Sequence, residues 1–351
     1  MSLDDADRPA PFSPLMRDQS TGIFAVGYQG VPGAYSEKAT KQLLGDVNAV
    51  GFPNFEDVFA AVENGEMEYG MVPIENSLGG SIHTNYDLLL TYKLHIVAEL
   101  DFRVEHCLLA MPGVKKADIK KVMSHPQALA QCAHYIQRLP ATPMAQYDTA
   151  GSAKLLHEQE LRDTAAIASN LAAVHYNLEV LDSNIEDDDN NFTRFLLLSR
   201  EPQTPSPDLQ MKTSVVFSFG NSNQQGQLHK ALCAFSLRDI DLTKIESRPG
   251  RPEALSGMWN TPTEGPPKKY KYIFYVDLLG FPDQSHVDNA LQHLREFCPL
   301  VRVLGSYPAG GELIGRVKRR ADGMMESPAK ETFVPRRRLR IGIIGFGTFG
   351  Q

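Results

Sequence analysis

A hydroxyl and a guanidinium follow one another at Thr193 and Arg194, after an acidic, asparagine-rich stretch at 186–191 and before an apolar run at 195–198. The acidic stretch predicts a turn, and the apolar run predicts a strand that is buried on both faces. Open α/β sheets bind ligands at strand ends, so Thr193 and Arg194 are candidates to line a ligand pocket. The alternative is structural: Thr193 is an ordinary β-branched strand residue, and Arg194 pairs with the acidic cluster.

A second polar group follows the predicted strand 71–74. Residues 75–81 provide a carboxyl group (Glu75), an amide (Asn76), two hydroxyls (the first on Ser77) and two glycines. A loop that only connects two elements rarely needs so many polar groups, so a binding or catalytic role is one interpretation. The other is that Asn76 and Ser77 cap the next helix.

A glycine-rich loop follows the first predicted strand, at 22–27. Gly27, Gly30 and Gly33 would let backbone amides approach a ligand closely, and a helix predicted to start near Tyr35 points its N-terminus at the same place. This arrangement favours an anion, most simply a carboxylate. It does not indicate a nucleotide loop, because the Gly-Lys-Ser/Thr ending is missing.

Two more polar turns open predicted helices. Ser124 follows a short predicted strand and is expected to cap a helix, with Gln131 about two turns later on the same face. His125 has the side chain of a general acid or base, but it precedes a proline in a turn without an evident partner, so a structural role is favoured. The stretch 148–154, which includes Thr149, opens another helix.

The composition is that of a globular protein: 351 residues, 42% hydrophobic and 22% charged, enough for more than one core. The formal net charge of −7 argues against nucleic acid as the main partner. No apolar run approaches the roughly 20 residues of a membrane helix, which predicts a soluble protein without membrane contact. The four cysteines lie far apart, which fits reduced thiols better than a metal site or a disulfide framework.

The N-terminal tail, 1–21, has no apolar segment of the kind that a secretory signal needs, and we expect it to be disordered. Its aspartates also argue against an intact organelle transit peptide. A plastid protein would therefore have lost its targeting segment, and otherwise the cytoplasm is expected.

Repeated strand–turn–helix units predict a two-lobed α/β domain over 22–200, with a ligand cleft between the lobes. A proline-rich linker then leads to a β-α-β-β-α-β order, which predicts a ferredoxin-like α+β sandwich. Its charged residues form no catalytic grouping, so it is expected to bind or regulate. The predicted limits are 22–102 and 188–200 for lobe 1, 103–187 for lobe 2, 201–210 for the linker and 211–308 for the C-terminal domain.

A connector rich in glycine, proline and charge, 309–335, precedes a strand and a Gly-x-Gly-x-x-Gly sequence at 336–351. This is the opening of a dinucleotide-binding unit. The helix and the acidic residue expected ~20 positions further on are missing, so these residues cannot bind NAD(P) as they stand.

Five motifs, in one order, resemble the prephenate/arogenate dehydratase family, and they are most similar to plant-type arogenate dehydratases. The resemblance covers about 22–308 and implies a periplasmic-binding-protein-like catalytic domain followed by an ACT domain, whose motifs match 226–232 and 246–249. The last residues are similar to the start of a prephenate or arogenate dehydrogenase, as in a truncated fusion. The five motifs are Tyr28-Gln29-Gly30 with Gly33-Ala34-Tyr35-Ser36, Pro73-Ile74-Glu75-Asn76-Ser77, Ser124-His125-Pro126-Gln127, Asp148-Thr149-Ala150 and Thr193-Arg194-Phe195.

The resemblance implies removal of water and carbon dioxide from a cyclohexadiene, without metal or coenzyme: arogenate gives phenylalanine and prephenate gives phenylpyruvate. Thr193 is then expected to hydrogen-bond or protonate the departing hydroxyl, and positioned proton donation is typically worth ~10²–10⁴-fold. Glu75 is the candidate proton source if its pocket raises its pKa. Arg194 and the amides of 30–34 suit the carboxylates. The residues expected to bind substrate are Gly30, Ala34, Tyr35, Ser36, Asn76, Ser77, Ser124, Gln131, Thr149, Arg194 and Phe195.

The resemblance also implies a phenylalanine effector at a subunit interface of a homodimer or homotetramer. The residues expected near it are Gly226, Leu228, Glu246 and Ser247. Gln227 stands where the family usually has an apolar residue, which puts the tightness of this feedback in question.

Two other functions compete with the dehydratase. A non-catalytic amino-acid receptor is one, because two-lobed α/β domains also bind solutes; the missing secretion signal and the presence of Thr193 argue against it. An NAD(P) dehydrogenase is the other, and the missing cofactor domain excludes it for this sequence.

Overall fold

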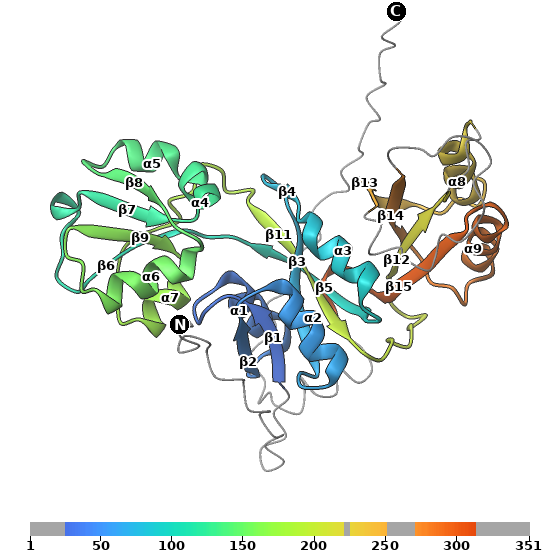
Figure 1. Ribbon diagram of the computed structural model, residues 1–351, viewed down its shortest axis with the longest axis horizontal. Helices are drawn as coiled ribbons and strands as arrows, with labels where there is room; N and C mark the ends of the chain where they lie inside the picture. The colour runs from blue at the N-terminus through green and yellow to red at the C-terminus, as the bar shows by residue number, and fades with distance from the viewer. Residues whose placement is uncertain (1–24, 221–224, 251–270, 314–351) are drawn as a thin grey trace, which may run out of the picture.

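The strands of the described residues form three sheets, which belong to two lobes and a C-terminal domain (Figure 1). The computed structural model describes residues 25–220, 225–250 and 271–313. Outside them lie the predicted tail at 1–21, most of the predicted connector at 309–335, and the dinucleotide-like end at 336–351.

Lobe 1 combines residues from both ends of the predicted catalytic domain. Its elements are β1 (Ala25–Gln29), α1 (Tyr35–Leu44), β2 (Asn48–Phe52), α2 (Phe55–Asn64), β3 (Tyr69–Asn76), β4 (Gly80–Ser81), α3 (His83–Thr91), β5 (His95–Arg103) and β11 (Phe192–Ser199). The strand order is β2-β1-β3-β11-β5, with β4 paired to β3. β11 arrives from far along the chain and lies antiparallel between β3 and β5.

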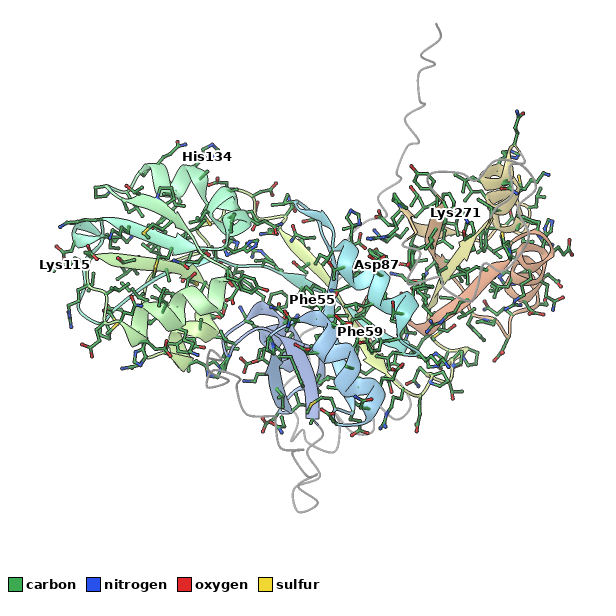
Figure 2. All side chains as sticks on the ribbon, in the orientation of Figure 1. Phe55, Phe59, Asp87, Lys115, His134 and Lys271 are labelled. Carbon is green, nitrogen blue, oxygen red and sulfur yellow. The ribbon has the colours of Figure 1, made fainter. Side chains whose placement is uncertain are left out.

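The helix α2 shows how local sequence sets the ends of an element. The carboxylate of Asp57 accepts a hydrogen bond from the backbone amide of Asn54 at 3.1 Å, which satisfies a donor at the helix start. The helix ends at Gly65, whose φ of 83° is left-handed. Phe59 is fully buried against the sheet, and Phe55 lies one turn before it (Figure 2).

Lobe 2 has its own sheet, in the order β10-β6-β9-β7-β8. Its elements are β6 (Cys107–Ala110), η1 (Lys116–Asp118), β7 (Lys121–Ser124), α4 (Pro126–Gln131), α5 (Ala133–Gln137), β8 (Thr142–Ala145), α6 (Thr149–Glu158), β9 (Thr164–Ala168), α7 (Asn170–His175) and β10 (Glu179–Ser183). The chain enters this lobe between β5 and β6 and leaves it between β10 and β11, so two segments join the lobes (Figure 1). This is the predicted two-lobed arrangement.

The C-terminal domain consists of β12 (Met211–Ser218), α8 (Gln227–Ser236), β13 (Leu242–Pro249), β14 (Tyr272–Leu279), α9 (Ser285–Phe297), β15 (Leu300–Pro308) and η3 (Ala309–Gly311). The order of its sheet, β13-β14-β12-β15, confirms the predicted ferredoxin-like fold. The limits predicted for the domains stay a prediction.

The C-terminal sheet uses both of its faces. Phe274, Val276 and Leu278 of β14 pack with the helices α8 and α9, and the alternating residues face lobe 1. Tyr275 of β14 lies in one core with Tyr86 of α3, and its hydroxyl donates to the Tyr86 carbonyl at 2.9 Å. Arg248 of β13 bonds Asp87, on the side of α3 next to this domain, at 2.7 Å (Figure 2). Lobe 1 and the C-terminal domain therefore share a packed interface.

Three local predictions differ from the structure. β3 continues through Glu75 and Asn76, and β11 starts at Phe192, because the two strands pair over these residues. Thr193 and Arg194 thus lie inside a strand. The cap of α4 is His125, whose Nδ1 accepts from the Gln127 amide at 3.2 Å, instead of Ser124.

Candidate active site

The hydroxyl of Thr193 is held by an amide from the neighbouring strand. Thr193 is 9% exposed, and its Oγ1 accepts a hydrogen bond from Nδ2 of Asn76 at 3.0 Å. The two residues are direct partners in the β3–β11 ladder, so their side chains lie on the same face of the sheet. Because the amide donates, the hydroxyl keeps its own hydrogen for another acceptor.

Asn76 and Ser77 organise the turn between β3 and β4. Oδ1 of Asn76 accepts from the amides of Leu78 and Gly79 at 3.1 and 2.7 Å. The Ser77 hydroxyl donates to the carbonyl of Asn190 at 2.7 Å and accepts from the Phe192 amide at 2.9 Å. These two predicted site residues therefore lie beside Thr193, where they tie the turn to the start of β11.

Asn191 belongs to this group and was missed at the level of sequence. Its side chain is fully buried, and its Oδ1 accepts from Nδ2 of Asn76 at 2.8 Å. Among the described residues, its Nδ2 has no hydrogen-bond partner. A buried donor without an acceptor costs free energy unless a ligand or water satisfies it. The sequence predicted that Asn191 lies in an acidic turn. Its position two residues before Thr193 was the only sequence feature that indicated a place in the site.

Lobe 2 approaches the same turn through Gln127. A Cβ atom built at Gly79 would lie 1.9 Å from Nε2 of Gln127, so the start of α4 packs directly against the β3–β4 turn. The motif 124–127 therefore faces Asn76 and Gly79 through Gln127, which was not among the predicted site residues. The hydroxyl of Ser124 is buried and donates to the carbonyl of Ile167, within lobe 2, at 2.7 Å.

Glu75 lies on the opposite face of the sheet from Thr193. Glu75 pairs with Arg194 in the ladder, and side chains alternate between faces along each strand. The Glu75 carboxylate contacts the guanidinium of Arg194 at 3.0 Å and the ammonium of Lys244 at 2.5 Å. The structure therefore does not bring Glu75 to Thr193, and the Glu75 carboxylate pairs instead with two cations on the opposite face.

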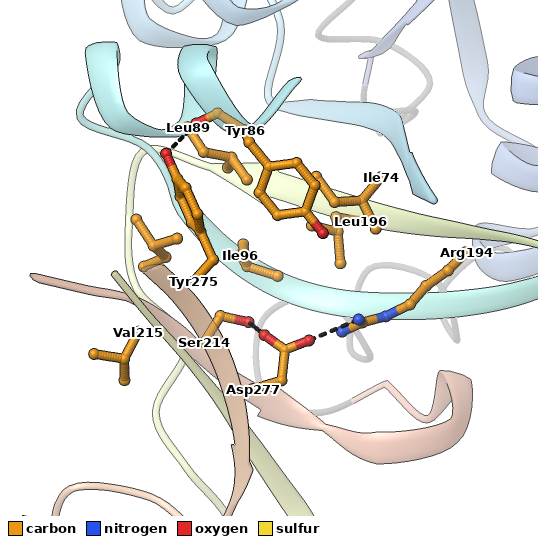
Figure 3. Close-up of a pocket in the computed structure, with 11 residues that line it drawn as sticks. Ile74, Tyr86, Leu89, Ile96, Arg194, Leu196, Ser214, Val215, Tyr275 and Asp277 are labelled. Carbon is orange, nitrogen blue, oxygen red and sulfur yellow. Dashed lines mark hydrogen bonds and ion pairs between the residues drawn. The ribbon is translucent and has the colours of Figure 1, made fainter. Parts of the chain in front are cut away.

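Arg194 serves the interface with the C-terminal domain. Its guanidinium contacts Glu99 at 2.7 Å, Asp277 at 2.6 Å and the Tyr307 hydroxyl at 3.0 Å. Figure 3 shows Arg194 reaching toward Asp277, which in turn accepts from Ser214 at 2.6 Å. We call Arg194, Glu75, Glu99, Asp277 and Tyr307 the Arg194 group. Because these partners occupy its donors, the prediction that Arg194 binds a substrate carboxylate is wrong for this arrangement.

The glycine loop binds a carboxylate from its own chain. The amide of Gly33 donates to Oε2 of Glu37 at 2.7 Å, and the amides of Gly30 and Ala34 donate to backbone carbonyls. Burial raises the pKa of Glu37, but the hydrogen bonds from Lys41 and Gly33 outweigh burial and hold it below its usual range. The predicted anion site at 30–34 is therefore filled by Glu37.

The same loop joins the lobes. The hydroxyl of Ser169 donates to the Gly33 carbonyl at 2.6 Å, and His175 contacts Glu37 at 3.2 Å. A Cβ atom at Gly33 would lie 2.6 Å from Cα of Ala172, and its φ of 91° is left-handed. Glycine is required here both by its conformation and by the backbone of the other lobe.

Replacing Gly33 by alanine is expected to destabilise the protein by about 1–3 kcal/mol more than replacing Gly113, because a methyl group must be forced between the lobes. Gly113→Ala is the matched control: its φ is 79°, but nothing lies within 4 Å of the new atom. Urea unfolding of both variants measures the difference. If both variants lost the same free energy of unfolding, the backbone at Ala172 would have moved to admit the methyl group without loss of stability.

A buried histidine links the lobes at their junction. Nδ1 of His106 lies 2.7 Å from the hydroxyl of Tyr35, and its Nε2 lies 2.9 Å from Oε1 of Gln131. Tyr35 and Gln131, both predicted for substrate, thus meet at His106 and not at Thr193. The sequence offered no signal for His106, because it stands between two predicted strands.

Acid is expected to weaken the protein partly through His106. Burial, more than any other cause, lowers the pKa of this imidazole below its usual 6.5. When the pH falls below the pKa of a free histidine, His106 takes up a proton in the unfolded chain but resists it in the folded chain. The free energy of unfolding therefore decreases. When the pH is lowered from 7.5 to 5.5, the free energy of unfolding of His106→Gln should fall by about 1 kcal/mol less than that of wild type, as measured by urea unfolding. His157→Gln, at an exposed position of α6, is the matched control for the loss of an imidazole.

The remaining predicted residues have varied surroundings. Thr149 is the first residue of α6, after the N-cap Asp148, as the sequence predicted. Ser36 is buried in α1. Phe195 is a core residue, packed edge-on against Phe102 with 6.0 Å between ring centroids, so its predicted contact with substrate is wrong for this arrangement. Its side chain lies on the same face as Thr193, two residues away, where both strand faces are buried.

The predicted effector residues lie on two sides of the C-terminal domain. Gly226 precedes α8 with a left-handed φ of 73°, and Leu228 is 36% exposed. Ser247 is exposed, whereas Glu246 faces lobe 1 and accepts a hydrogen bond from Ser81. Strand alternation separates these two neighbours.

Two general properties of the described residues bear on function. They include no group of three or more histidine, cysteine, aspartate or glutamate side chains arranged to hold a metal ion. None of their helices has the length and apolar character needed to cross a membrane.

Comparison with known proteins shows the family of the chain. The family model described as prephenate dehydratase matches residues 26–203, the part of the chain that contains both lobes. Arogenate dehydratase 2 of Petunia hybrida is 50% identical over 284 residues, which are 81% of this chain and 71% of that protein. The chain belongs to the prephenate dehydratase family. As a member of this family, it is a dehydratase enzyme.

One further relative and two solved structures extend the comparison. Arogenate dehydratase/prephenate dehydratase 2, chloroplastic, of Arabidopsis thaliana is 46% identical, over 86% of this chain and 79% of that protein. The prephenate dehydratase of Arthrobacter aurescens, solved in complex with L-Phe, is 31% identical with a TM-score of 0.72, over 84% of this chain and 92% of that one. A structure described as a quorum quenching acylase, GqqA, is 36% identical with a TM-score of 0.70, over 82% and 98%.

Proposed function

We propose that the chain catalyses the decarboxylating dehydration of arogenate to phenylalanine, and of prephenate to phenylpyruvate, in phenylalanine biosynthesis. The observation that carries this proposal is the Thr193 hydroxyl, held by Asn76 at a turn where both lobes meet. The plant relatives named for arogenate, or for arogenate and prephenate together, support this choice of substrates.

The chemistry needs little from the protein beyond positioning. Formation of the aromatic ring drives the reaction, and the hydroxyl of the substrate must leave as water. The hydrogen bond from Asn76 polarises the Thr193 oxygen, which makes its own O–H a better donor to the departing group. The free Nδ2 of Asn191, next to Asn76, is a further donor for the substrate. Glu75 is not given a role in this step, because its carboxylate is paired elsewhere.

The C-terminal domain is proposed to be an ACT domain that binds phenylalanine between two copies of the chain, in a homodimer or homotetramer. The complex of the Arthrobacter relative with L-Phe supports the effector. The edge strand β13 exposes Ile245 (49%) and Ser247 on the same face as the helix α8, which carries Leu228. An exposed apolar edge of this kind suits pairing with a second copy. The chloroplastic relatives support a plastid location.

The proposal is tested by supplying arogenate and prephenate separately and following phenylalanine and phenylpyruvate. The expected result is turnover of one or both substrates, with products that appear in step with carbon dioxide. An N-acyl amide belongs in the same assay, because a similar structure is described as an acylase. An acylase needs a nucleophile activated by a base, whereas the side chain that contacts Thr193 is an amide. Hydrolysis of the amide without dehydration would refute the proposed function.

A further inference from the structure

The β3–β4 hairpin has two faces with different partners. Glu75 pairs with Ser81 across the hairpin, and Asn76 pairs with Gly80. Since directly opposed residues share a face and successive residues alternate, Glu75 and Ser81 point one way and Asn76 points the other. Asn76 contacts Thr193, so the question is what holds the opposite face.

Strand β13 of the C-terminal domain holds that opposite face at two points. The ammonium of Lys244 lies 2.5 Å from Oε2 of Glu75, and the hydroxyl of Ser81 donates to Oε2 of Glu246. Lys244 and Glu246 are two residues apart, so they lie on one face of β13, and their charged groups are 3.8 Å apart. All three charged side chains are less than one-third exposed. β13 thus contacts both strands of the hairpin at once.

Asn76 is the connection from this contact to the catalytic hydroxyl. It follows Glu75 directly and holds Thr193 through Nδ2 and the turn amides of Leu78 and Gly79 through Oδ1. Asn76 follows Glu75 in β3 and pairs with Gly80, the neighbour of Ser81, so a backbone shift of Glu75 and Ser81 would be passed on to Asn76. Gln127 of lobe 2 packs on the same turn, so the same displacement would also move Gln127.

We propose that β13 sets the position of the Thr193 hydroxyl by binding the β3–β4 hairpin through Lys244 and Glu246. These two side chains are positioning residues. Any change in the C-terminal domain that shifts β13 then changes the rate of the reaction without touching substrate. Ser247, on the other face of β13, belongs to the proposed phenylalanine site, so an effector that shifts β13 there would also shift Lys244 and Glu246. The part of this inference that concerns rate rests on the proposed function.

The test compares Lys244→Met with wild type, with Lys244→Arg, and with Lys230→Met. Lys244→Met keeps the length of the side chain but removes one of the two cations that pair with Glu75, while the other, Arg194, remains. Lys244→Arg keeps the charge and serves as the rescue. Lys230 is exposed on α8, in the same domain, and makes Lys230→Met the matched control. All four full-length proteins are examined by hydrogen exchange and by steady-state kinetics with arogenate and prephenate.

Hydrogen exchange of the Leu78 and Gly79 amides reports the position of Asn76 whether or not the enzyme turns over. Lys244→Met is expected to speed this exchange about tenfold, the effect of losing a charged hydrogen bond. Its kcat should fall about tenfold with KM within about twofold, because a misplaced group affects the reacting step. Lys244→Arg should restore most of the wild-type exchange rate and kcat. Lys230→Met should have the same exchange rate and kcat as wild type.

The inference is overturned if exchange at Leu78 and Gly79 is the same in Lys244→Met and wild type. It is also overturned if the exchange rises but kcat does not change in an active enzyme. A wild-type protein that turns over neither substrate would refute the proposed function instead, and the exchange measurement would still decide whether β13 grips the hairpin.

Discussion

Thr193→Ala is expected to lower kcat by about 10²–10⁴-fold, since the departing hydroxyl loses its positioned donor. The fold should survive the change. Nδ2 of Asn76 keeps the side-chain oxygen of Asn191 at 2.8 Å and the Phe192 carbonyl at 3.1 Å, so no donor is left without an acceptor. Turnover of arogenate and prephenate by the purified variant, with thermal unfolding alongside, measures both effects.

Thr193→Ser is the control for this experiment. Serine restores the oxygen and its hydrogen without the methyl group, so it should recover most of the activity that alanine loses. A Thr193→Ala enzyme as fast as wild type would remove Thr193 from the mechanism. A serine variant as slow as alanine would indicate that the methyl group and its packing, not the hydroxyl, carry the effect.

Arg194→Met is expected to destabilise the protein by about 3–5 kcal/mol. The guanidinium lies between the carboxylates of Glu99, Asp277 and Glu75, and its removal leaves the buried carboxylate of Asp277 without a cation. Lys212, 2.6 Å from Glu99, and Lys244, 2.5 Å from Glu75, still neutralise two of the three carboxylates, so the loss falls on Asp277. Urea unfolding followed by circular dichroism measures the loss, which should exceed that of an exposed arginine many times over.

Arg295→Met is the matched control, because Arg295 is exposed on α9 and its loss should change stability by no more than about 0.5 kcal/mol. Arg194→Lys should rescue only part of the stability, since an ammonium cannot make the forked contacts of a guanidinium with Glu99 and Asp277. If Arg194→Met unfolded at the same urea concentration as wild type, the Arg194 group would not contribute to the interface as the structure indicates.

Sequence reasoning located the polar turns but could not say which way their side chains point. Thr193 and Arg194 are adjacent, and a strand places adjacent side chains on opposite faces. One face carries Thr193 with Asn76, and the other carries Arg194 with Glu75. If one face of the strand were polar, the alternation of polar and apolar residues would show which side chains point to which face. β11 is buried on both faces, so its sequence does not distinguish the two.

The glycine loop shows a second limit. Its amides were predicted to bind an anion, and they do, but the anion is Glu37, four residues after Gly33. A carboxylate from the protein and one from a substrate are equivalent to a backbone amide. The sequence could not exclude the internal partner, because the first turn of a helix can supply a carboxylate to the amides at its own N-terminus, as Glu37 does.

By itself, the sequence determined the two-lobed α/β domain, the ferredoxin-like domain after it and the family, because strand and helix periods and motif order are local properties. It also identified Thr193, Asn76 and Ser77, which the structure brings together. Only the tertiary structure decided that Arg194 and Glu75 serve the domain interface, that His106 joins the lobes, and that β13 holds the hairpin beside Thr193. Those pairings join residues 25 to 169 positions apart, and no local pattern encodes which distant partner a charged side chain will meet.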